Sequence, residues 1–312
     1  MRVILAPMDG VLDGCMRDIL TRSGAFDLCM TEFLRVTAQI NPLKVFRRIC
    51  PEMDKGWRTP SGTPVVLQIL GSIPGAMAAN AEIAVKLGAP GIDINFGCPS
   101  KSVTRKGCGA ILLKEPRRIH DIVKAVRGVV PVGVSLSAKM RLGYDNTDLA
   151  LENAAAIEEA GADFITVHAR TRADAYSVPA SWEWLARINE VSSIPIVANG
   201  DISSVEDYNR CISISGCKDV MIGRGAVSSP GLAGEIKASL AGLRPEKLAW
   251  DEIHAMITAM AEVRKGSYDD GHIGTRVKLW LVYLKKEYSE AGLCFQQVCR
   301  INEYSAMSPL PL

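Results

Sequence analysis

Short apolar runs, often β-branched, alternate with amphipathic segments over roughly the first 240 residues of the chain. The amphipathic segments repeat their apolar positions every three or four residues, which is typical of helices that cover a core. We expect such helices at 77–87, 117–126, 149–160, 182–190 and 205–214. The apolar runs are too short for helices and predict strands at 3–5, 28–31, 65–69, 92–94, 134–139, 164–167, 194–198 and 220–222.

Eight strands alternating with helices have the number and length expected of an α/β fold of the (β/α)8 TIM barrel type. The main structural alternative is a doubly wound open sheet, which would place a Gly-x-Gly-x-x-Gly turn after its first strand. Residues 6–10 at that place are Ala-Pro-Met-Asp-Gly. The sequence therefore favours the barrel.

The alternation of strands and helices stops near residue 240. Helical periodicity then continues alone at 252–265 and 276–288, and a further helix is expected at 294–302. We therefore predict two domains, a TIM barrel at 1–240 and a small all-α domain at 241–312. The Pro-rich end at 308–312 predicts an unstructured tail.

Composition indicates a soluble intracellular protein. The chain has 312 residues, 48% of them hydrophobic, but no apolar run long enough for a transmembrane helix. Its first nine residues predict a strand rather than a signal peptide. The nine cysteines are odd in number and include no Cys-x-x-Cys pair. This favours reduced thiols in the cytoplasm over a disulfide framework or a zinc site, and we expect no membrane partner.

The net charge of +2 gives no indication of a nucleic-acid partner, but the distribution of charge does. Basic residues outnumber acidic ones in three clusters, at 35–48, 101–118 and 264–286. Each cluster taken alone is expected to be an ordinary solvent-exposed surface. If the fold brings them together, they predict a surface for an anionic partner.

The chemistry of a barrel enzyme lies where its strands end. Cys98 follows one predicted strand within an Asn-x-Gly-Cys-Pro turn, where a thiol is exposed. A cysteine is more often a small buried core residue, but this setting favours a reactive thiol. The strand ends include no pair of carboxylates suited to hydrolysis and no cluster with metal-ligand spacing, so we expect no metal. Asp93 and Asp163 precede their strand ends, and we expect them to be structural.

The other strand ends suggest a phosphorylated, anionic cofactor. Barrels often bind phosphate in the loops after the last two strands, where this chain has Asn199-Gly200-Asp201 and Gly223-Arg224. A lysine inside a barrel needs an anionic partner, and a reduced flavin would supply one to Lys139. Gln68 could hydrogen-bond to the flavin ring, and His168 would be a further cofactor contact.

Together these motifs resemble those of the tRNA-dihydrouridine synthase family over essentially the full length of the chain. Within the family the chain is most similar to the bacterial C subfamily, on segments 31–36, 48–52, 276–280 and 283–288. The family motifs are Ala6-Pro7-Met8, Thr31-Glu32, Gln68, Asn95-x-Gly97-Cys98-Pro99, Gly107-x-Gly109-Ala110, Lys139-Met140-Arg141-Leu142-Gly143, Val167-His168-Ala169-Arg170-Thr171, Asn199-Gly200-Asp201 and Met221-Ile222-Gly223-Arg224.

The resemblance implies an FMN enzyme that reduces the C5–C6 double bond of the D-loop uridine at position 16 of tRNA, with NADPH or NADH as electron donor. It implies that Cys98 is the proton donor and that the helical domain binds tRNA. The implied FMN contacts are Pro7, Met8, Asp9, Gln68, Lys139, Asn199, Gly200, Asp201, Gly223 and Arg224. The implied tRNA contacts are Arg35, Asn95, Tyr176, Arg276 and Lys278.

The mechanism asks for a protonated thiol, so we expect the pKa of Cys98 near its ordinary value of about 8.5. The target base must be flipped into the barrel, where Asn95 would bind its polar edge and Tyr176 would pack on it. A tRNA-sized surface must stay open, and we therefore expect a monomer.

Two other functions compete with this hypothesis. An FMN-dependent dehydrogenase of the dihydropyrimidine or dihydroorotate type explains the flavin site but not the basic loop or the added helices. An RNA-binding protein with an inactive barrel explains the basic surface, but the intact Cys98, Lys139 and phosphate loops argue against it.

Overall fold

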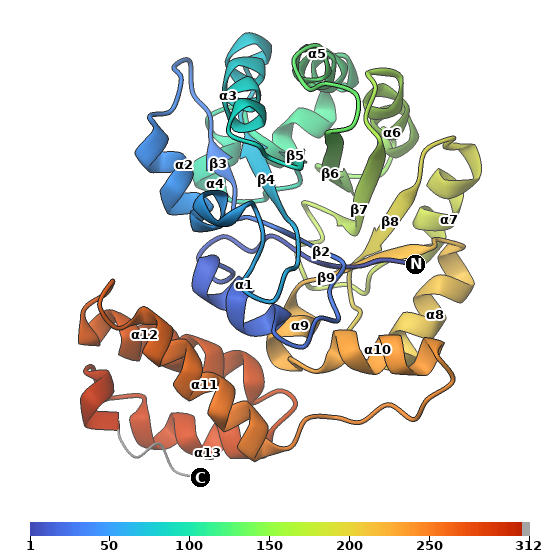
Figure 1. Ribbon diagram of the computed structural model, residues 1–312. Helices are drawn as coiled ribbons and strands as arrows, with labels where there is room; N and C mark the ends of the chain where they lie inside the picture. The colour runs from blue at the N-terminus through green and yellow to red at the C-terminus, as the bar shows by residue number, and fades with distance from the viewer. Residues whose placement is uncertain (308–312) are drawn as a thin grey trace.

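A computed structural model describes residues 1–307 and shows a closed barrel of eight parallel strands with helices around it (Figure 1). Each strand pairs in parallel with the next, and the last pairs with the first. The predicted TIM barrel is therefore confirmed. Its strands are β1 (Val3–Leu5), β2 (Leu28–Met30), β4 (Val65–Leu70), β5 (Gly91–Phe96), β6 (Ser135–Gly143), β7 (Phe164–Thr171), β8 (Ile196–Asn199) and β9 (Asp219–Ile222).

A short additional strand, β3 (Leu34–Arg35), pairs with the end of β4. β2 and β3 both pair with β4, but the register shifts between them. Met30 is opposite Val66 and Leu34 is opposite Ile69. The chain thus advances four residues from Met30 to Leu34 while β4 advances three from Val66 to Ile69. The chain between β2 and β3 therefore has one residue more than the facing part of β4.

Strands β6 and β7 run further than the sequence predicted. β6 ends at Gly143 and β7 at Thr171, whereas we expected ends at 139 and 167. Lys139 and His168 thus lie inside their strands and not at the ends. The prediction stopped where charged residues begin, yet Lys139 and Arg141 are two positions apart and therefore share one side of β6.

The five helices predicted for the barrel are present as α3 (Pro74–Lys86), α5 (Pro116–Arg127), α6 (Ala150–Glu159), α7 (Trp182–Val191) and α8 (Val205–Ser215). Several shorter elements were not predicted. They are α1 (Gly14–Thr21), α2 (Leu43–Ile49), η1 (Pro51–Lys55), α4 (Lys101–Thr104), η2 (Gly109–Lys114), α9 (Arg224–Ser228) and α10 (Leu232–Leu240). Helix α1 was missed because its buried side includes Arg17, Asp18 and Thr21, which break the apolar period.

Arg17 of α1 forms a buried ion pair with Glu52 of η1. Its guanidinium donates to both carboxylate oxygens at 2.8 Å and to the carbonyl oxygens of Leu12 and Ile49 at 2.9 and 3.0 Å. The Arg17 side chain is 0% exposed and that of Glu52 is 6% exposed. The pair therefore has polar partners on all sides, as a buried charge requires.

Replacing Glu52 with alanine is expected to destabilise the fold by about 3–5 kcal/mol, because it leaves the Arg17 charge buried without its partner. Asp54→Ala is the matched control. It breaks the Arg47–Asp54 pair, whose side chains are 52% and 54% exposed, and should cost less than about 1 kcal/mol. Urea unfolding followed by circular dichroism measures both. Equal shifts in the two midpoints would contradict a structural role for the buried pair.

Beyond α10 the chain forms α11 (Trp250–Arg264), α12 (Asp270–Leu284), α13 (Ser289–Val298) and η3 (Tyr304–Met307), which pack together beside the barrel (Figure 1). Helix α12 begins at Asp270 and not at 276, because the Asp269 side chain caps it by accepting from the His272 N–H at 2.7 Å. The division into domains 1–240 and 241–312 stays a prediction. The predicted tail at 308–312 lies outside the described residues.

One carboxylate joins these helices to the barrel. Asp13, the N-cap of α1, pairs with Arg264 of α11 at 2.7 Å and with Arg276 of α12 at 3.3 Å. The Arg276 guanidinium also donates to the carbonyl oxygens of Gly10 and Val11 at 2.5 and 2.7 Å. Within residues 1–307, no helix combines the length and apolar character needed to cross a membrane.

Candidate active site

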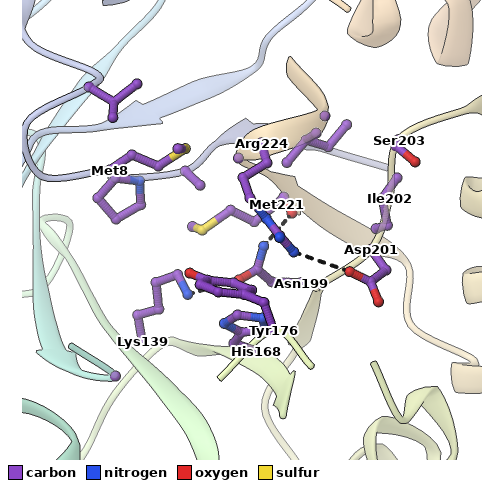
Figure 2. A pocket seen from close by; sticks show the side chains of 18 of the residues that line it. Met8, Lys139, His168, Tyr176, Asn199, Asp201, Ile202, Ser203, Met221 and Arg224 are labelled. Atoms are coloured by element: carbon purple, nitrogen blue, oxygen red, sulfur yellow. Dashed lines mark hydrogen bonds and ion pairs between the residues drawn. The ribbon is translucent and has the colours of Figure 1, made fainter. Parts of the chain in front are cut away.

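A cavity of about 690 Å³ opens at the C-terminal ends of the barrel strands (Figure 2). The structure brings together almost all predicted site residues in its wall. They are Pro7, Met8, Asp9, Gln68, Asn95, Cys98, Lys139, His168, Tyr176, Asn199, Gly200, Asp201, Gly223 and Arg224. Tyr283, Lys286 and Glu287 of the C-terminal helical region also line it, so both parts of the chain meet at one opening.

Lys139 extends from β6 into the floor of this cavity. Its ammonium donates to the Asn199 side-chain oxygen at 2.8 Å, and the Asn199 amide in turn donates to the carbonyl of Met221 at 2.8 Å. Burial, together with the nearby Arg141 charge, lowers the pKa of Lys139 to about 7. No salt bridge involves Lys139 in the described chain, so an anionic ligand would stabilise its charged form.

The loop after β8 is held in an uncommon conformation. Gly200 has a φ of 120°, and a Cβ there would come within 3.1 Å of the His168 ring. Asp201 accepts hydrogen bonds from Arg170, from the Ala180 N–H at 2.9 Å and from Arg224 at 3.2 Å. Although burial opposes the shift, these donors hold the pKa of Asp201 below its ordinary value. The Asp201 carboxylate therefore fixes the two predicted phosphate loops to each other.

Tyr176 lies above these loops. Its ring is 4.0 Å from the Arg224 guanidinium and its centroid is 6.0 Å from that of His168 (Figure 2). The residue is 54% exposed, so part of its side chain is accessible to a ligand. Burial and the surrounding cations lower the pKa of His168 well below its ordinary value, which keeps the imidazole neutral.

Cys98 is half-buried at the rim of the cavity, in the turn after β5. The Asn95 side-chain oxygen accepts from the backbone N–H groups of Gly97 and Cys98 at 3.0 and 2.8 Å. Burial raises the pKa of the Cys98 thiol, so the thiol is protonated at neutral pH. This shift goes beyond the ordinary value that we expected, in the direction that favours a proton donor.

Arg141 is a site residue to which the sequence analysis assigned no role. Its guanidinium donates to the Gly97 carbonyl at 2.9 Å and to the Thr171 carbonyl at 3.1 Å, and so braces the turn that presents Cys98. The available signal was its spacing of two from Lys139, which puts both side chains on one side of a strand.

Three predicted tRNA contacts lie outside the cavity lining. Arg35 donates to the Ser102 carbonyl at 3.3 Å, next to the Cys98 turn. Arg276 binds the barrel loop as described above, and Lys278 donates to the Ile301 carbonyl at 2.8 Å. Their contact with RNA stays a prediction. Lys101, Arg105 and Lys106 are exposed near Arg35, and none forms an ion pair within the described part of the chain.

The donors around the cavity fit a flavin mononucleotide. Lys139 can face the anionic part of a reduced ring, and Arg224 can bind a phosphate. Gly223 leaves space for close approach, since a Cβ there would come within 3.3 Å of Met8. Among residues 1–307, no three His, Cys, Asp or Glu side chains are grouped as metal ligands.

Residues 4–298 match the family model described as dihydrouridine synthase. The chain belongs to this family. This match confirms the family that the motifs indicated. It favours a dihydrouridine synthase over the alternative of a small-molecule dehydrogenase. As a member, the chain is an oxidoreductase that converts uridine to dihydrouridine.

Curated relatives match the chain over nearly its full length, and the three described here, like the others of similar identity, are named tRNA-dihydrouridine(16) synthase. The protein of Aquipseudomonas alcaligenes is 44% identical, over 99% of this chain and 100% of its own. That of Pseudomonas syringae pv. tomato is 47% identical over 99% and 98%. That of Escherichia coli O157:H7 is 44% identical over 97% and 94%.

Solved structures of other enzymes share the fold. Histamine dehydrogenase from Rhizobium sp. 4-9 superposes with a TM-score of 0.56 at 14% identity, over 84% of this chain and 48% of its own. A 2-naphthoyl-CoA reductase superposes with a TM-score of 0.56 at 11% identity, over 78% and 50%. At this level of identity the likeness concerns the barrel alone.

Proposed function

We propose that the protein reduces the C5–C6 double bond of uridine 16 in the D loop of tRNA, with FMN as cofactor and NADPH as electron donor. The observation that carries this proposal is one cavity whose wall includes both a protonated thiol and a lysine that has no ion-pair partner among residues 1–307. Relatives named for position 16 support the choice of uridine.

When bound, the flavin supplies the hydride that C6 of the uracil ring receives. Lys139 would bind the anionic edge of the ring, and the N–H of the Gln68 amide would orient it. The loops at 199–201 and 223–224 would hold the phosphate through Arg224 and backbone N–H groups. Pro7, Met8 and Asp9 at the end of β1 complete the wall.

The Cys98 thiol donates a proton to C5 of the uracil ring. Burial keeps this proton on the sulfur at neutral pH, which a general acid requires. Asn95 holds the backbone of Cys98 in place and retains one amide hydrogen for the polar edge of the base. Tyr176 offers an exposed ring for stacking.

We propose that the C-terminal helices form a tRNA-binding domain. Their Tyr283 and Lys286 line the cavity, and the exposed basic group at 101–106 lies beside the Cys98 turn. Phosphate contacts of this kind fix the register of an RNA without reading its sequence. Arg35, Arg276 and Lys278 would define how the tRNA lies. No disulfide joins any of the nine cysteines, all of which lie within residues 1–307, and this suits a monomer that acts in the cytoplasm.

Expression in a bacterial strain that lacks dihydrouridine tests the proposed position. We expect dihydrouridine at position 16 of the tRNAs and unmodified uridine at position 20, mapped by sequencing after chemical cleavage at the reduced base. The Cys98→Ala protein is the matched control and should restore neither position. Dihydrouridine at position 20 with position 16 untouched would refute the proposed site and leave the enzyme class intact.

A further inference from the structure

A line of buried hydrogen bonds crosses strands β6, β5 and β4 directly below the Cys98 turn. Ser137 donates to one Asp93 oxygen at 2.7 Å, and the Gln68 amide donates to the other at 2.6 Å. The Asn95 amide donates to the Gln68 oxygen at 2.8 Å, and the Asn95 oxygen accepts from the Cys98 N–H at 2.8 Å. The strand register makes this line possible, because Gln68, Asp93 and Ser137 are direct neighbours.

The direction of this line depends on the carboxylate. A side-chain amide can turn over, which exchanges its donor and its acceptor. An ionised carboxylate only accepts, so the Gln68 NH₂ group must face Asp93 and the Gln68 oxygen must face Asn95. The Asn95 NH₂ group is thereby turned toward Gln68, and its oxygen is left for the N–H groups of the Cys98 turn.

We propose that Asp93 is a positioning residue for Cys98, which sets the orientation of the Gln68 and Asn95 amides and thereby holds the thiol at the cavity. The inference rests on the proposed role of Cys98 as proton donor. It also assigns Gln68 one free N–H toward the flavin, with its oxygen already used by Asn95.

The burial of both side chains supports this role. Asp93 and Gln68 are 0% exposed, so a misdirected amide could not be satisfied by water. Burial raises the pKa of Asp93 above its ordinary value, and the hydrogen bonds from Gln68 and Ser137 and the nearby Lys139 limit that rise. We expected Asp93 to be structural, and the proposal gives that structural residue a specific task at the Cys98 turn.

Asp163 provides a comparison at the neighbouring pair of strands, β6 and β7. It accepts from the Leu136 N–H at 2.7 Å and pairs with Arg127 at 3.3 Å, just before the first residue of β7. It is therefore a carboxylate that joins β6 and β7 at the opposite end of the barrel from Cys98. Its side chain is 51% exposed, so replacing it tests the loss of a carboxylate that joins strands, without the burial of Asp93.

The test compares Asp93→Leu, Asp93→Asn and Asp163→Asn in the FMN-loaded full-length protein. Hydrogen exchange measured by mass spectrometry reports on the amides of Gly97 and Cys98, which depend on Asn95. Stopped-flow absorbance measures flavin reduction by NADPH and flavin reoxidation by unmodified tRNA separately.

Asp93→Leu should raise the exchange rate of both amides by about tenfold or more. It should slow reoxidation by tRNA about 100-fold, with reduction by NADPH within about threefold of the wild type. Asp93→Asn should recover most of both losses, because its oxygen can accept from Gln68 while its NH₂ group donates to Ser137. Asp163→Asn should match the wild type in both readouts.

Unchanged exchange in Asp93→Leu, an Asp93→Asn protein as impaired as Asp93→Leu, or equal losses in Asp163→Asn would each overturn the inference. If Asp93→Leu does not fold, Gln68→Leu is used instead, because it removes the middle of the line of hydrogen bonds. An unchanged exchange rate of the Cys98 amide in Gln68→Leu would then overturn the inference. Cys98→Ala separates the proposed role of Cys98 from that of Asp93. Reoxidation at the wild-type rate in Cys98→Ala would contradict the role of the thiol as proton donor. The exchange rates of the Gly97 and Cys98 amides test the role of Asp93 independently.

Discussion

Replacing Cys98 with alanine is expected to slow reoxidation of the flavin by tRNA by roughly 10²–10⁴-fold, the usual cost of losing a positioned general acid. Flavin reduction by NADPH should be unchanged, because the thiol has no part in it. The burial that raises the pKa of Cys98 keeps the proton on sulfur, so the rate of the wild type should fall only when the thiol ionises at alkaline pH. Single-turnover absorbance of the flavin at several pH values measures this.

Cys108 provides the control for this prediction. It is a second thiol near the cavity, is 6% exposed, and lies in the same small apolar cluster that Cys98 packs against. Its sulfur contacts Ser72 and the Lys106 carbonyl and does not line the cavity. Cys108→Ala should therefore reoxidise within about threefold of the wild type. Similar losses in the two variants would show that the thiol at 98 is not the proton donor.

The Lys139→Met protein is expected to be purified without flavin, or to bind added FMN at least about tenfold more weakly than the wild type, because the buried cation opposite the ring is removed. Fluorescence titration of the cofactor-free protein with FMN measures the affinity. Lys86→Met, at a side chain that is 70% exposed, is the control and should bind normally. A yellow, fully active Lys139→Met protein would place the flavin elsewhere.

The same substitution should have the opposite effect on the stability of the cofactor-free protein. The folded state lowers the pKa of Lys139 from 10.5 to about 7, so folding disfavours the charged form. This penalty is complete below about pH 7 and disappears as the pH rises toward 10.5. Lys139→Met should therefore melt at a higher temperature than the wild type at pH 6, and the difference should vanish near pH 10. A difference that grows with pH would contradict the assignment.

The periodicity of apolar residues was sufficient for the barrel, because six of its eight strands have four or more residues and most residues of these strands are buried. The same periodicity failed to predict elements in which a polar side chain is buried against a partner distant in the sequence. Arg17 interrupts the pattern of apolar positions on the buried side of α1, and its partner Glu52 is 35 residues away. Likewise the charges of Arg141 and Arg170 concealed the ends of β6 and β7.

The cavity was predictable at positions where the residue type alone suggests a ligand, such as Lys139, Cys98 and the glycine loops. The roles that depend on partners were not. Asp93 was assigned to structure because its connection to Cys98 runs through two amides on neighbouring strands. Arg276 was assigned to RNA, and no local pattern indicated that it also holds the barrel loop at Gly10 and Val11.

The attachment of the C-terminal helices at Asp13 limits how such proteins can be recombined. The carboxylate that begins α1 also receives a guanidinium from α11 and another from α12. The Trp280 indole adds a hydrogen bond of 3.0 Å to the Val227 carbonyl. A chimera that transplants residues 250–307 onto another barrel must therefore carry the loop at 10–13 with it. Otherwise Arg264, which is fully buried, would lack its counter-ion in the hybrid.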